Sequence, residues 1–188
     1  MQYRCEWAQS DPLLVQYHDT EWGVPEHDDT RQFEFLSLEI MQAGLSWLTV
    51  LRKREGFRRV FYGFDVPRVA AMTDHDVERL LQDEGIIRNR MKIEAIINNA
   101  RAVLHMQKQQ TLAEFFWSYV NGVPLDSRIA MDEDVPASTP LSHRISKDLK
   151  AHKFRFTGPT IIYAHMQATG IVNDHEKRCF RHDQVHPH

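Results

Sequence analysis

Residues 81–97 read LQDEGIIRNRMKIEAII and contain the clearest helical pattern in the sequence. Gly85 permits a tight turn after an apolar helical segment, and Asn89 is a good cap for a second helix. The apolar residues of that second helix recur at intervals of three and four, which places them on one face. The stretch therefore predicts two helices joined by a short turn, within residues 80–97.

A hairpin of this kind is typical of helix-hairpin-helix elements. The turn amides and the N-terminus of the second helix can hold a DNA phosphate through hydrogen-bond donors and the helix dipole. Arg88 and Lys92 would add positive charge near the nucleic-acid backbone. An ordinary αα-hairpin without a ligand fits the same residues equally well, so the sequence leaves both interpretations open.

Helical signals continue on both sides of the hairpin, and no convincing strand alternation occurs. Caps and apolar periodicity predict a helix after Ser46, a loop at 121–140, and helices at 12–21, 30–43, 73–82, 89–104, 111–117, 142–151 and 158–169. We therefore expect an all-α protein that forms a single unit over residues 1–188. Within it we expect two helical subdomains, one made of residues 1–60 with 140–180 and the other a bundle at 61–139.

The composition excludes several classes of protein. Hydrophobic residues make up 42% of the chain, which is ordinary for a globular protein and too high for a disordered one. A net charge of −3 argues against a uniformly basic nucleic-acid binder, although basic residues cluster at 52–59, 88–92 and 144–155. Each cluster is either a solvated helix face or a contact surface.

No apolar run approaches the roughly 20 residues of a membrane span. The N-terminus also lacks the apolar stretch of a signal peptide, so we expect a cytoplasmic protein without membrane contact.

Two cysteines and two histidines near the chain ends form the first candidate site. Cys5 and His18 lie in the N-terminal segment, while His175 and Cys179 are four residues apart, so one helical turn would bring them to the same face. Two thiolates and two imidazoles are the ligands of a closed tetrahedral zinc site. Their spacing matches no standard short zinc finger, so plain buried thiols and unrelated histidines remain the alternative. A disulfide is not expected in the reducing cytosol.

Aromatic residues around one acidic residue form the second candidate site. Three of the four tryptophans, Trp7, Trp22 and Trp47, fall early in the chain, and Tyr17 lies among them. Glu39 stands within an apolar run, so its helix would turn the carboxylate toward apolar or aromatic surface. Such surroundings suit an electron-poor or cationic base, because rings stack on it and the carboxylate hydrogen-bonds its edge. In the alternative interpretation the tryptophans are core residues and Glu39 is a solvated helix position.

A metal-dependent phosphohydrolase is a further class to consider. His18-Asp19 is the dipeptide that some of these enzymes use for metal binding. They require further His and Asp ligands from other helices, and His75 and His143 show no supporting pattern. Two cysteines and two histidines would also leave no open metal position, so the sequence argues against this class.

Ten short segments of the chain match the pattern of one known family. They are RCEW (4–7), DPL (11–13), YHDTEWGVP (17–25), LE (38–39), QAGLSW (42–47), VAAM (69–72), GIIR (85–88), KI (92–93), AII (95–97) and VNDH (172–175). With them the chain resembles the bacterial DNA-3-methyladenine glycosylase I family. The resemblance runs from about residue 3 to 179, and the long N-terminal segments are far more specific than any single short motif.

The resemblance implies a helix-hairpin-helix DNA glycosylase fold with one structural zinc that joins the N- and C-terminal segments. The ligands carried over residue by residue are Cys5, His18, His175 and Cys179. It also implies a base pocket in which Glu39 is the essential acid and Trp47 is the stacking platform. The residues placed around the base are Trp7, Tyr17 and Trp22.

The resemblance further implies the reaction. The family's substrate is adenine methylated at N3 in double-stranded DNA, a cationic base whose bond to the sugar is already weak. Water would capture the sugar and 3-methyladenine would leave, without a lysine nucleophile and therefore without strand cleavage. We expect Leu45 with Gln42 to fill the gap left by the flipped nucleotide. Gly85, Arg88 and Lys92 would hold the phosphates, and the enzyme would act as a monomer.

Two departures from the family pattern stand out. Leu14 replaces the aromatic residue that well-known members carry after DPL, which would reshape one pocket wall. Residues 180–188 lack a match, and we expect an exposed tail there. A zinc-stapled DNA-binding module without catalysis is the second interpretation of the chain, and such a module would not need Glu39 beside Trp47.

Overall fold

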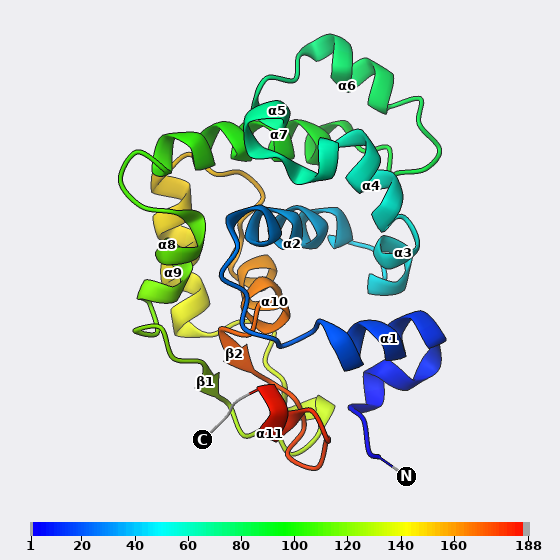
Figure 1. Cartoon of the computed structure of the whole chain (residues 1–188), viewed down its shortest axis with the longest axis vertical. Helices are drawn as coiled ribbons and strands as arrows, with labels where there is room; N and C mark the ends of the chain where they lie inside the picture. The colour runs from blue at the N-terminus through cyan, green and yellow to red at the C-terminus, as the bar shows by residue number, and fades with distance from the viewer. Residues whose placement is uncertain (1, 186–188) are drawn as a thin grey trace.

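The computed structural model describes residues 2–185, and its regular structure is mostly helical. Helix α2 (Asp29–Gln42) runs through the centre, with α7 (Arg90–Met106) above it and α10 (Pro159–Ala168) below it (Figure 1). Helix α1 (Pro12–Thr20) lies at the lower end, near α11 (His182–Val185) (Figure 1). Segments from the two ends of the chain thus lie at the same end of the molecule.

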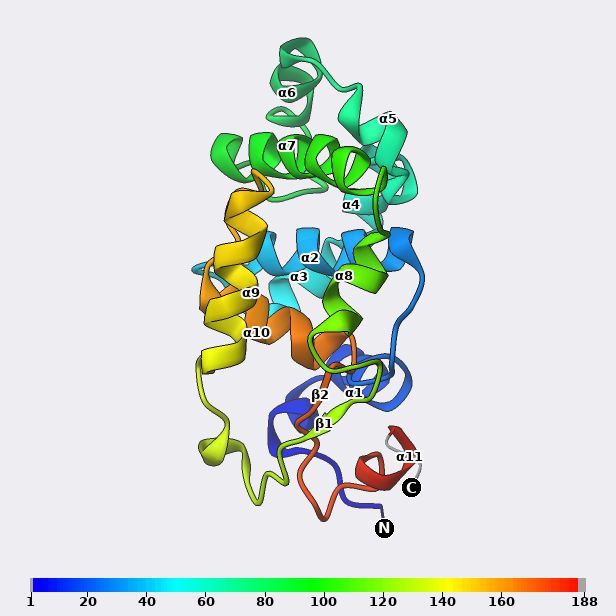
Figure 2. The same ribbon diagram turned by 90° about the vertical axis from the view of Figure 1, so that its left-hand side faces the viewer.

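The other elements fill the space around this central stack. They are η1 (Glu6–Ser10), α3 (Trp47–Arg52), α4 (Arg54–Val60), η2 (Tyr62–Phe64), α5 (Val66–Ala70), α6 (Asp74–Leu80), α8 (Leu112–Ser118), β1 (Leu125–Asp126), η3 (Asp132–Asp134), α9 (Pro140–Ala151) and β2 (Val172–Asn173). Figure 2 shows α9 and α8 in front of α2. No helix within residues 2–185 is both long and apolar enough to cross a membrane.

The helices begin where the capping residues predict. The Ser46 side chain accepts a hydrogen bond from the amide of Thr49, and Asn89 accepts one from the amide of Lys92. Thr111 forms a capping box with Glu114. These contacts satisfy amides that have no partner inside the helix. The predicted helix starts are therefore confirmed to within one or two residues.

One continuous apolar core joins helices from the two predicted subdomains. Buried side chains of α2, α4, α7, α9 and α10 belong to the same cluster, from Phe33 through Ile96 to Ile162. The proposed division of the chain at residues 60 and 140 therefore stays a prediction. The packing does explain why α2 is buried along almost its whole length, which matters for the site that it carries.

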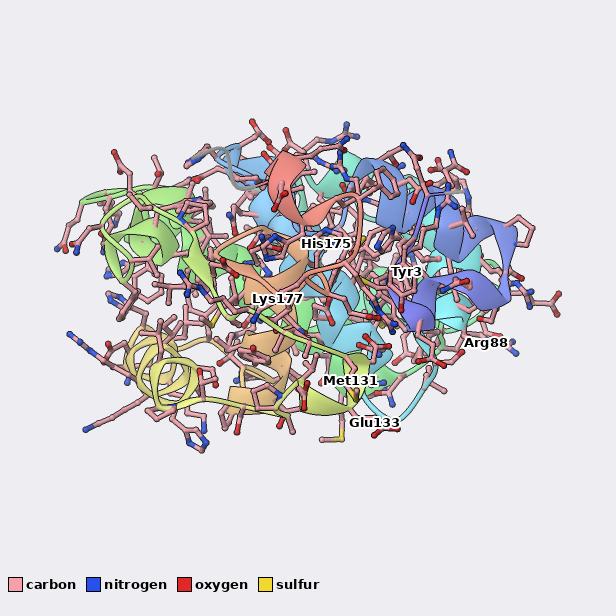
Figure 3. All side chains as sticks on the ribbon, turned by 90° about the horizontal axis from the view of Figure 1, so that it is seen from below. Tyr3, Arg88, Met131, Glu133, His175 and Lys177 are labelled. Atoms are coloured by element: carbon pink, nitrogen blue, oxygen red, sulfur yellow. The ribbon has the colours of Figure 1, made fainter. Side chains whose placement is uncertain are left out.

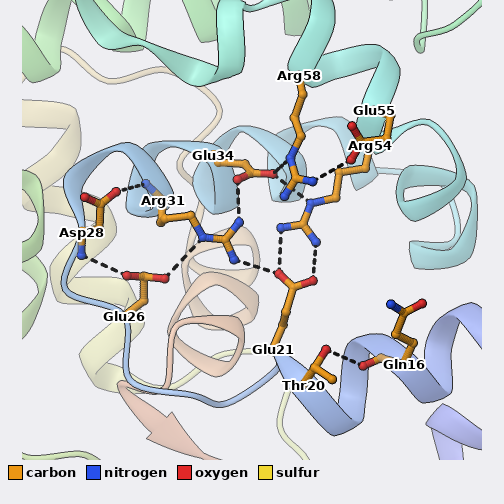
Figure 4. Close-up of polar contacts among 10 residues, drawn as sticks. All are labelled: Gln16, Thr20, Glu21, Glu26, Asp28, Arg31, Glu34, Arg54, Glu55 and Arg58. Carbon is orange, nitrogen blue, oxygen red and sulfur yellow. Dashed lines mark hydrogen bonds and ion pairs between the residues drawn. The ribbon is translucent and has the colours of Figure 1, made fainter.

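A buried ion network fastens the end of α1 to α2 and α4 (Figure 4). Glu34 accepts hydrogen bonds of 2.8 Å from each of Arg31, Arg54 and Arg58. Glu21, just after α1, accepts two further hydrogen bonds from Arg54 and one from Arg31. Buried charges are tolerated when they are paired in this way. Arg54 and Arg58 of the first basic cluster are therefore engaged in ion pairs that hold the fold together.

The turn between α6 and α7 needs its glycine for a different reason from the one expected. The backbone of Gly85 does not lie in the left-handed region. A Cβ on Gly56 of α4 would collide with the carbonyl oxygen of Gly85, and a Cβ on Gly85 would lie 2.9 Å from the guanidinium of Arg59. The pair of glycines thus allows close approach of α4 to the turn.

A short strand pairing was missed by the sequence analysis. β1 and β2 pair in parallel, with Leu125 opposite Val172 and Asp126 opposite Asn173. Two residues are too few to show the alternation by which strands are recognised. The expected all-α class is otherwise correct for the described residues, and the pairing ties the loop after α8 to the segment after α10.

The expectation of an exposed C-terminal tail is wrong for residues 180–185. The amide of Phe180 donates a hydrogen bond of 3.0 Å to the carbonyl of Tyr3, and Val185 of α11 is buried. Arg4 also lies over the ring of Phe180, at 5.5 Å. This segment therefore packs against the N-terminal segment, while residues 186–188 lie outside the described part of the chain.

Candidate functional site

A cavity of about 300 Å³ lies among α1, α2, α3, α10 and the loop that contains η3. Its volume is at the lower end of the range for small-molecule sites. The lining residues are Trp7, Tyr17, Trp22, Glu39, Gln42, Trp47, Asp132, Val135, Ala164 and Gln167. The cavity therefore brings together all five predicted pocket residues, from three separate parts of the N-terminal third of the chain.

Glu39 is the acidic residue of this cavity on α2. Its side chain is 5% exposed, and within residues 2–185 it makes no hydrogen bond or ion pair. Burial raises the pKa of Glu39 from its ordinary 4.5 to about 8. Because the side chain is buried, the interpretation of Glu39 as a solvated helix position is wrong. A buried carboxyl without a partner costs free energy.

Tyr17 and Trp47 place two further unpaired polar groups in the cavity wall. Their rings are 5.4 Å apart, and neither the Tyr17 hydroxyl nor the Trp47 Nε1 has a hydrogen-bond partner in the described chain. Burial, followed by the nearby Glu39 carboxylate, raises the pKa of Tyr17 well above its ordinary value. Two buried polar groups without a partner, beside a carboxyl that makes no hydrogen bond, are rare in one cavity of a folded protein and indicate a place where a ligand supplies the partners.

Trp7 and Trp22 form the side of the cavity nearest the chain ends. Their rings meet edge to face at 5.0 Å, and the Trp22 ring also lies 4.6 Å from that of His175. The Trp7 ring lies 5.5 Å from His18. These two aromatic residues therefore belong both to the cavity wall and to the surroundings of the second candidate site.

The second site is the cluster of Cys5, His18, His175 and Cys179, all four buried. Their ligand atoms lie within 4.8 Å of one another. Individual sulfur-to-nitrogen distances are 3.6 Å for Cys5 with His175, and 3.4 and 3.7 Å for Cys179 with His18 and His175. In a tetrahedral zinc site a sulfur and a nitrogen ligand lie about 3.5 Å apart. The four residues therefore fit a zinc ion.

Each histidine of the cluster is held by a hydrogen bond from its outer nitrogen. His18 Nδ1 pairs with the Asp19 carboxylate at 2.8 Å, and His175 Nε2 pairs with the carbonyl of Trp22 at 3.0 Å. The remaining nitrogen of each ring then faces the thiols, which is the arrangement that orients metal-binding histidines. Asp19 thus supports His18 from outside the cluster, and this position argues against the phosphohydrolase interpretation.

His175 and Cys179 come together differently from the expectation. Residues 175–179 form a turn and not a helix, with the amide of Cys179 donating to the carbonyl of Glu176 at 2.7 Å. A turn brings residues four apart together as well as a helix does. Figure 3 shows His175 among the elements at the lower end, near the segment that carries Tyr3.

The expectation that Lys92 contacts phosphate is wrong. Its side chain is buried, and its Nζ donates to the carbonyls of Met41 at 2.9 Å and Ala43 at 2.6 Å. Lys92 therefore caps backbone carbonyls at the C-terminus of α2, where a positive charge is favourable. Sequence alone could not show this, because the carbonyls that it meets are about fifty residues away.

Arg88 remains free for an outside partner. It is exposed and makes no side-chain contact within residues 2–185, and neither its own amide nor that of Ile87 donates a hydrogen bond there. Arg90 is instead paired with Glu78 at 2.6 Å, and the amide of Gly85 already donates to the Asp83 side chain.

The two predicted wedge residues lie at the end of α2 and just after it. Gln42, the last residue of α2, lines the cavity, and Leu45 is 41% exposed. Leu14, in contrast, is not a lining residue. It is 7% exposed and packs in an apolar cluster with Tyr17 and Phe35, so it supports the wall from behind.

Four lining residues were missed by the sequence analysis: Asp132, Val135, Ala164 and Gln167. The first two belong to the loop at 121–140, which the sequence marks only as irregular. Gln167 of α10 is held by the Asp174 carboxylate at 2.9 Å. No short motif singles out these positions, and only the fold brings them beside Glu39.

The aromatic walls and unpaired polar groups define a class of protein. Ring faces suit a flat heterocycle, and the buried carboxyl suits hydrogen-bond donors at its edge, as in enzymes that act on a base taken out of the nucleic-acid stack. A family model described as methyladenine glycosylase matches residues 7–182. The chain belongs to this family.

Curated relatives and solved structures agree with this assignment. DNA-3-methyladenine glycosylase 1 of Escherichia coli is 52% identical over 177 residues, which are 94% of this chain and 95% of that protein. A DNA-3-methyladenine glycosylase of Haemophilus influenzae is 44% identical over 180 residues, 95% and 97% of the two chains. A crystal structure of 3-methyladenine DNA glycosylase I matches with a TM-score of 0.93 and 54% identity, covering 96% of this chain and 100% of the other. A Staphylococcus aureus 3-methyladenine DNA glycosylase I, solved to explain 3-methyladenine recognition, has a TM-score of 0.92 and 38% identity over 95% and 96% of the chains.

Proposed function

We propose that this chain repairs alkylated double-stranded DNA by flipping 3-methyladenine out of the stack and hydrolysing its bond to the sugar. The observation that carries the proposal is the buried Glu39 carboxyl, which has no partner in the protein and lies in a cavity with the unpaired groups of Tyr17 and Trp47. An alkylated purine supplies what these groups lack: a ring face, hydrogen-bond donors and positive charge.

The residues have separate roles in this reaction. Trp47 stacks on the flipped base, and Glu39 accepts hydrogen bonds from its edge. The cationic base favours the ionised form of Glu39, although burial favours the neutral form in the empty cavity. Tyr17 supplies a further hydroxyl, and Trp7 and Trp22 complete the wall. Because methylation already weakens the glycosidic bond, water captures the sugar once the base is held.

The reaction leaves the DNA strand intact in this proposal. Strand cleavage by a glycosylase requires an amine nucleophile that forms a Schiff base with the sugar. No lysine lines the cavity in the part of the chain that the structure describes, and Lys92 is held by two carbonyls. We therefore expect a monofunctional enzyme.

Two segments make the DNA contacts in this proposal, the turn between α6 and α7 and the segment around the end of α2. Arg88 and the free amides of the turn between α6 and α7 hold phosphates, as in a helix-hairpin-helix element. The exposed Leu45, with Gln42, fills the gap left by the flipped nucleotide. We expect the protein to act as a monomer in the cytoplasm.

Zinc in the cluster at the chain ends has a structural role in this proposal. Cys5, His18, His175 and Cys179 would hold one ion in a closed tetrahedral site, which leaves no position for a reacting water. The ion would hold the N- and C-terminal segments together, and the chemistry of base release stays with the cavity residues.

The experiment that tests the function is release of bases from DNA treated with a methylating agent. Chromatography of the released material should show 3-methyladenine, and a denaturing gel should show intact strands until the abasic sites are cleaved chemically. A DNA-binding module without catalysis would release nothing. A bifunctional enzyme would nick the strand without chemical treatment.

A further inference from the structure

Asp132 is a second carboxylate of the cavity, and it comes from a different part of the fold from Glu39. It opens η3, in the loop at the lower end of the molecule, whereas Glu39 lies on the central helix α2 (Figure 1). The amide of Trp7 donates to Asp132 Oδ2 at 3.0 Å, which fixes the side chain against the cavity wall. That amide is its only polar contact within the described chain.

Asp132 forms no ion pair with a lysine or arginine of residues 2–185. The pKa of Asp132 is raised by burial first, and the nearby carboxylates of Glu176 and Glu6 raise it further, while the Trp7 amide and His18 act in the opposite direction. A partly buried carboxylate beside other carboxylates is unfavourable, and a positively charged ligand in the cavity would relieve this repulsion.

Building on the proposed function, we propose that Asp132 is a specificity-determining residue that selects purines carrying a positive charge over neutral purines of the same shape. Ring faces alone stack on neutral and cationic bases, and Glu39 in its neutral form can bind the edge of either. Asp132 is anchored to backbone, so its position does not depend on the ligand. The charge that it recognises is the one that alkylation of a ring nitrogen gives to a base in DNA.

The Asp132→Asn substitution separates charge from structure. Asparagine has the same shape and keeps an oxygen that accepts the Trp7 amide, so the loop stays anchored. Glu133→Gln is the matched control, because it removes the same charge from the next residue. Glu133 is exposed, makes no polar contact within the described chain and does not line the cavity (Figure 3).

The probes are two isosteric bases that differ in charge. In 3,9-dimethyladeninium a methyl group at N9 stands for the sugar and the ring is cationic, while 3,9-dimethyl-3-deazaadenine has carbon at position 3 and is neutral. Binding to native protein and to both variants is measured at about pH 8 by quenching of tryptophan fluorescence, since three tryptophans line the cavity. Release of 3-methyladenine from methylated DNA is measured for the same three proteins.

We expect Asp132→Asn to weaken binding of the cation about tenfold, as suits one unit charge across a half-exposed site, and to change binding of the neutral base less than about twofold. Glu133→Gln should change neither by more than about twofold. Equal losses for both bases, an equal loss in the control, or unchanged cation binding would each overturn the inference. If native protein releases 3-methyladenine while Asp132→Asn shows no selective loss, only this inference fails. If native protein releases none, the proposed function fails and the inference falls with it.

Discussion

Replacement of Glu39 by glutamine should stabilise the protein without ligand at high pH and slow base release. Burial raises the pKa of Glu39 from 4.5 to about 8. Each tenfold change in an acid constant corresponds to about 1.4 kcal/mol. Ionising this carboxyl in the empty cavity therefore costs on the order of 5 kcal/mol. Glutamine has nearly the same shape and never ionises, so the variant avoids this cost.

The sign of the pH dependence follows from proton binding. In the unfolded chain Glu39 ionises near pH 4.5, so between about pH 4.5 and 8 the folded state holds a proton that the unfolded state has lost. Raising the pH through this window therefore lowers the free energy of unfolding of the native protein, and the full loss is present above about pH 8. We expect native protein and Glu39→Gln to be similar in stability at about pH 5, and the variant to be more stable by several kcal/mol at about pH 9.

Two measurements on the same variant check the argument. Urea unfolding at a series of pH values gives the difference in the free energy of unfolding, with Glu133→Gln as an exposed control that should show little difference across this range. Single-turnover release of 3-methyladenine gives the catalytic effect. Glu39→Gln should fold and bind DNA but release the base at least about a hundredfold more slowly, since a charged hydrogen-bond partner at the reacting base is lost.

Particular results would refute this reasoning. A stability difference that does not change with pH would mean that Glu39 has a partner that holds it ionised in the empty protein. A Glu39→Gln variant that is less stable than native protein at about pH 9 would also mean that a partner holds Glu39 ionised in the empty protein. A Glu39→Gln protein that releases 3-methyladenine at the native rate would remove Glu39 from the mechanism.

The remaining predictions concern the cysteine and histidine cluster at the chain ends, the turn between α6 and α7, the contacts of Lys92 and the packing of α4. Purified protein should contain about one zinc per chain, and Cys179→Ser should lose the metal and melt at a lower temperature, because metal binding is coupled to folding; a metal-free native protein with unchanged melting in chelator would contradict this. Arg88→Ala should weaken binding to all DNA sequences alike and lower the salt slope by about one, whereas an unchanged slope would show that the turn does not contact DNA. Lys92→Ala should instead lower the free energy of unfolding by about 1–3 kcal/mol, because it leaves buried carbonyls without a donor; unchanged denaturant unfolding would argue that solvent replaces the lysine. Gly56→Ala should cost about 1–3 kcal/mol by overpacking against Gly85, and equal stability in urea would show that α4 moves aside.

The sequence predicts most of the helices because their ends carry local signals. Ser46, Asn89 and Thr111 cap helices through contacts that span only three residues, so the pattern is complete within a short window. The pairing of β1 with β2 has no such signal, because it joins residues nearly fifty positions apart over a length of two residues. The packing of residues 180–185 against the N-terminal segment also depends on contacts between the two ends of the chain.

Some residues of the candidate site can likewise be predicted from the nearby sequence, and others only from contacts between distant parts of the chain. Glu39 stands out in the sequence as an acidic residue within an apolar run, but its role and those of the aromatic residues in a base pocket are predicted from the family resemblance. Lys92 is predicted to contact DNA because it stands near Arg88 in the sequence, but its side chain is held by backbone carbonyls, whereas Arg88 makes no ion pair or side-chain hydrogen bond in the described chain. Asp132 was not found, because its meaning depends on the distant cavity that its loop reaches.

The cluster of Cys5, His18, His175 and Cys179 shares its structural elements with the cavity, and this explains why residues from the chain ends matter for a pocket built around α2. Trp7 follows Cys5 by two residues, and Tyr17 directly precedes His18. Trp22 meets His175 twice, through its ring at 4.6 Å and its carbonyl at 3.0 Å. Each wall residue on this side is therefore positioned by a neighbouring member of the cluster. In the proposed function the cavity discriminates between bases only if its walls keep their spacing, so the cluster would contribute to base recognition by holding those walls, although none of its four residues lines the cavity.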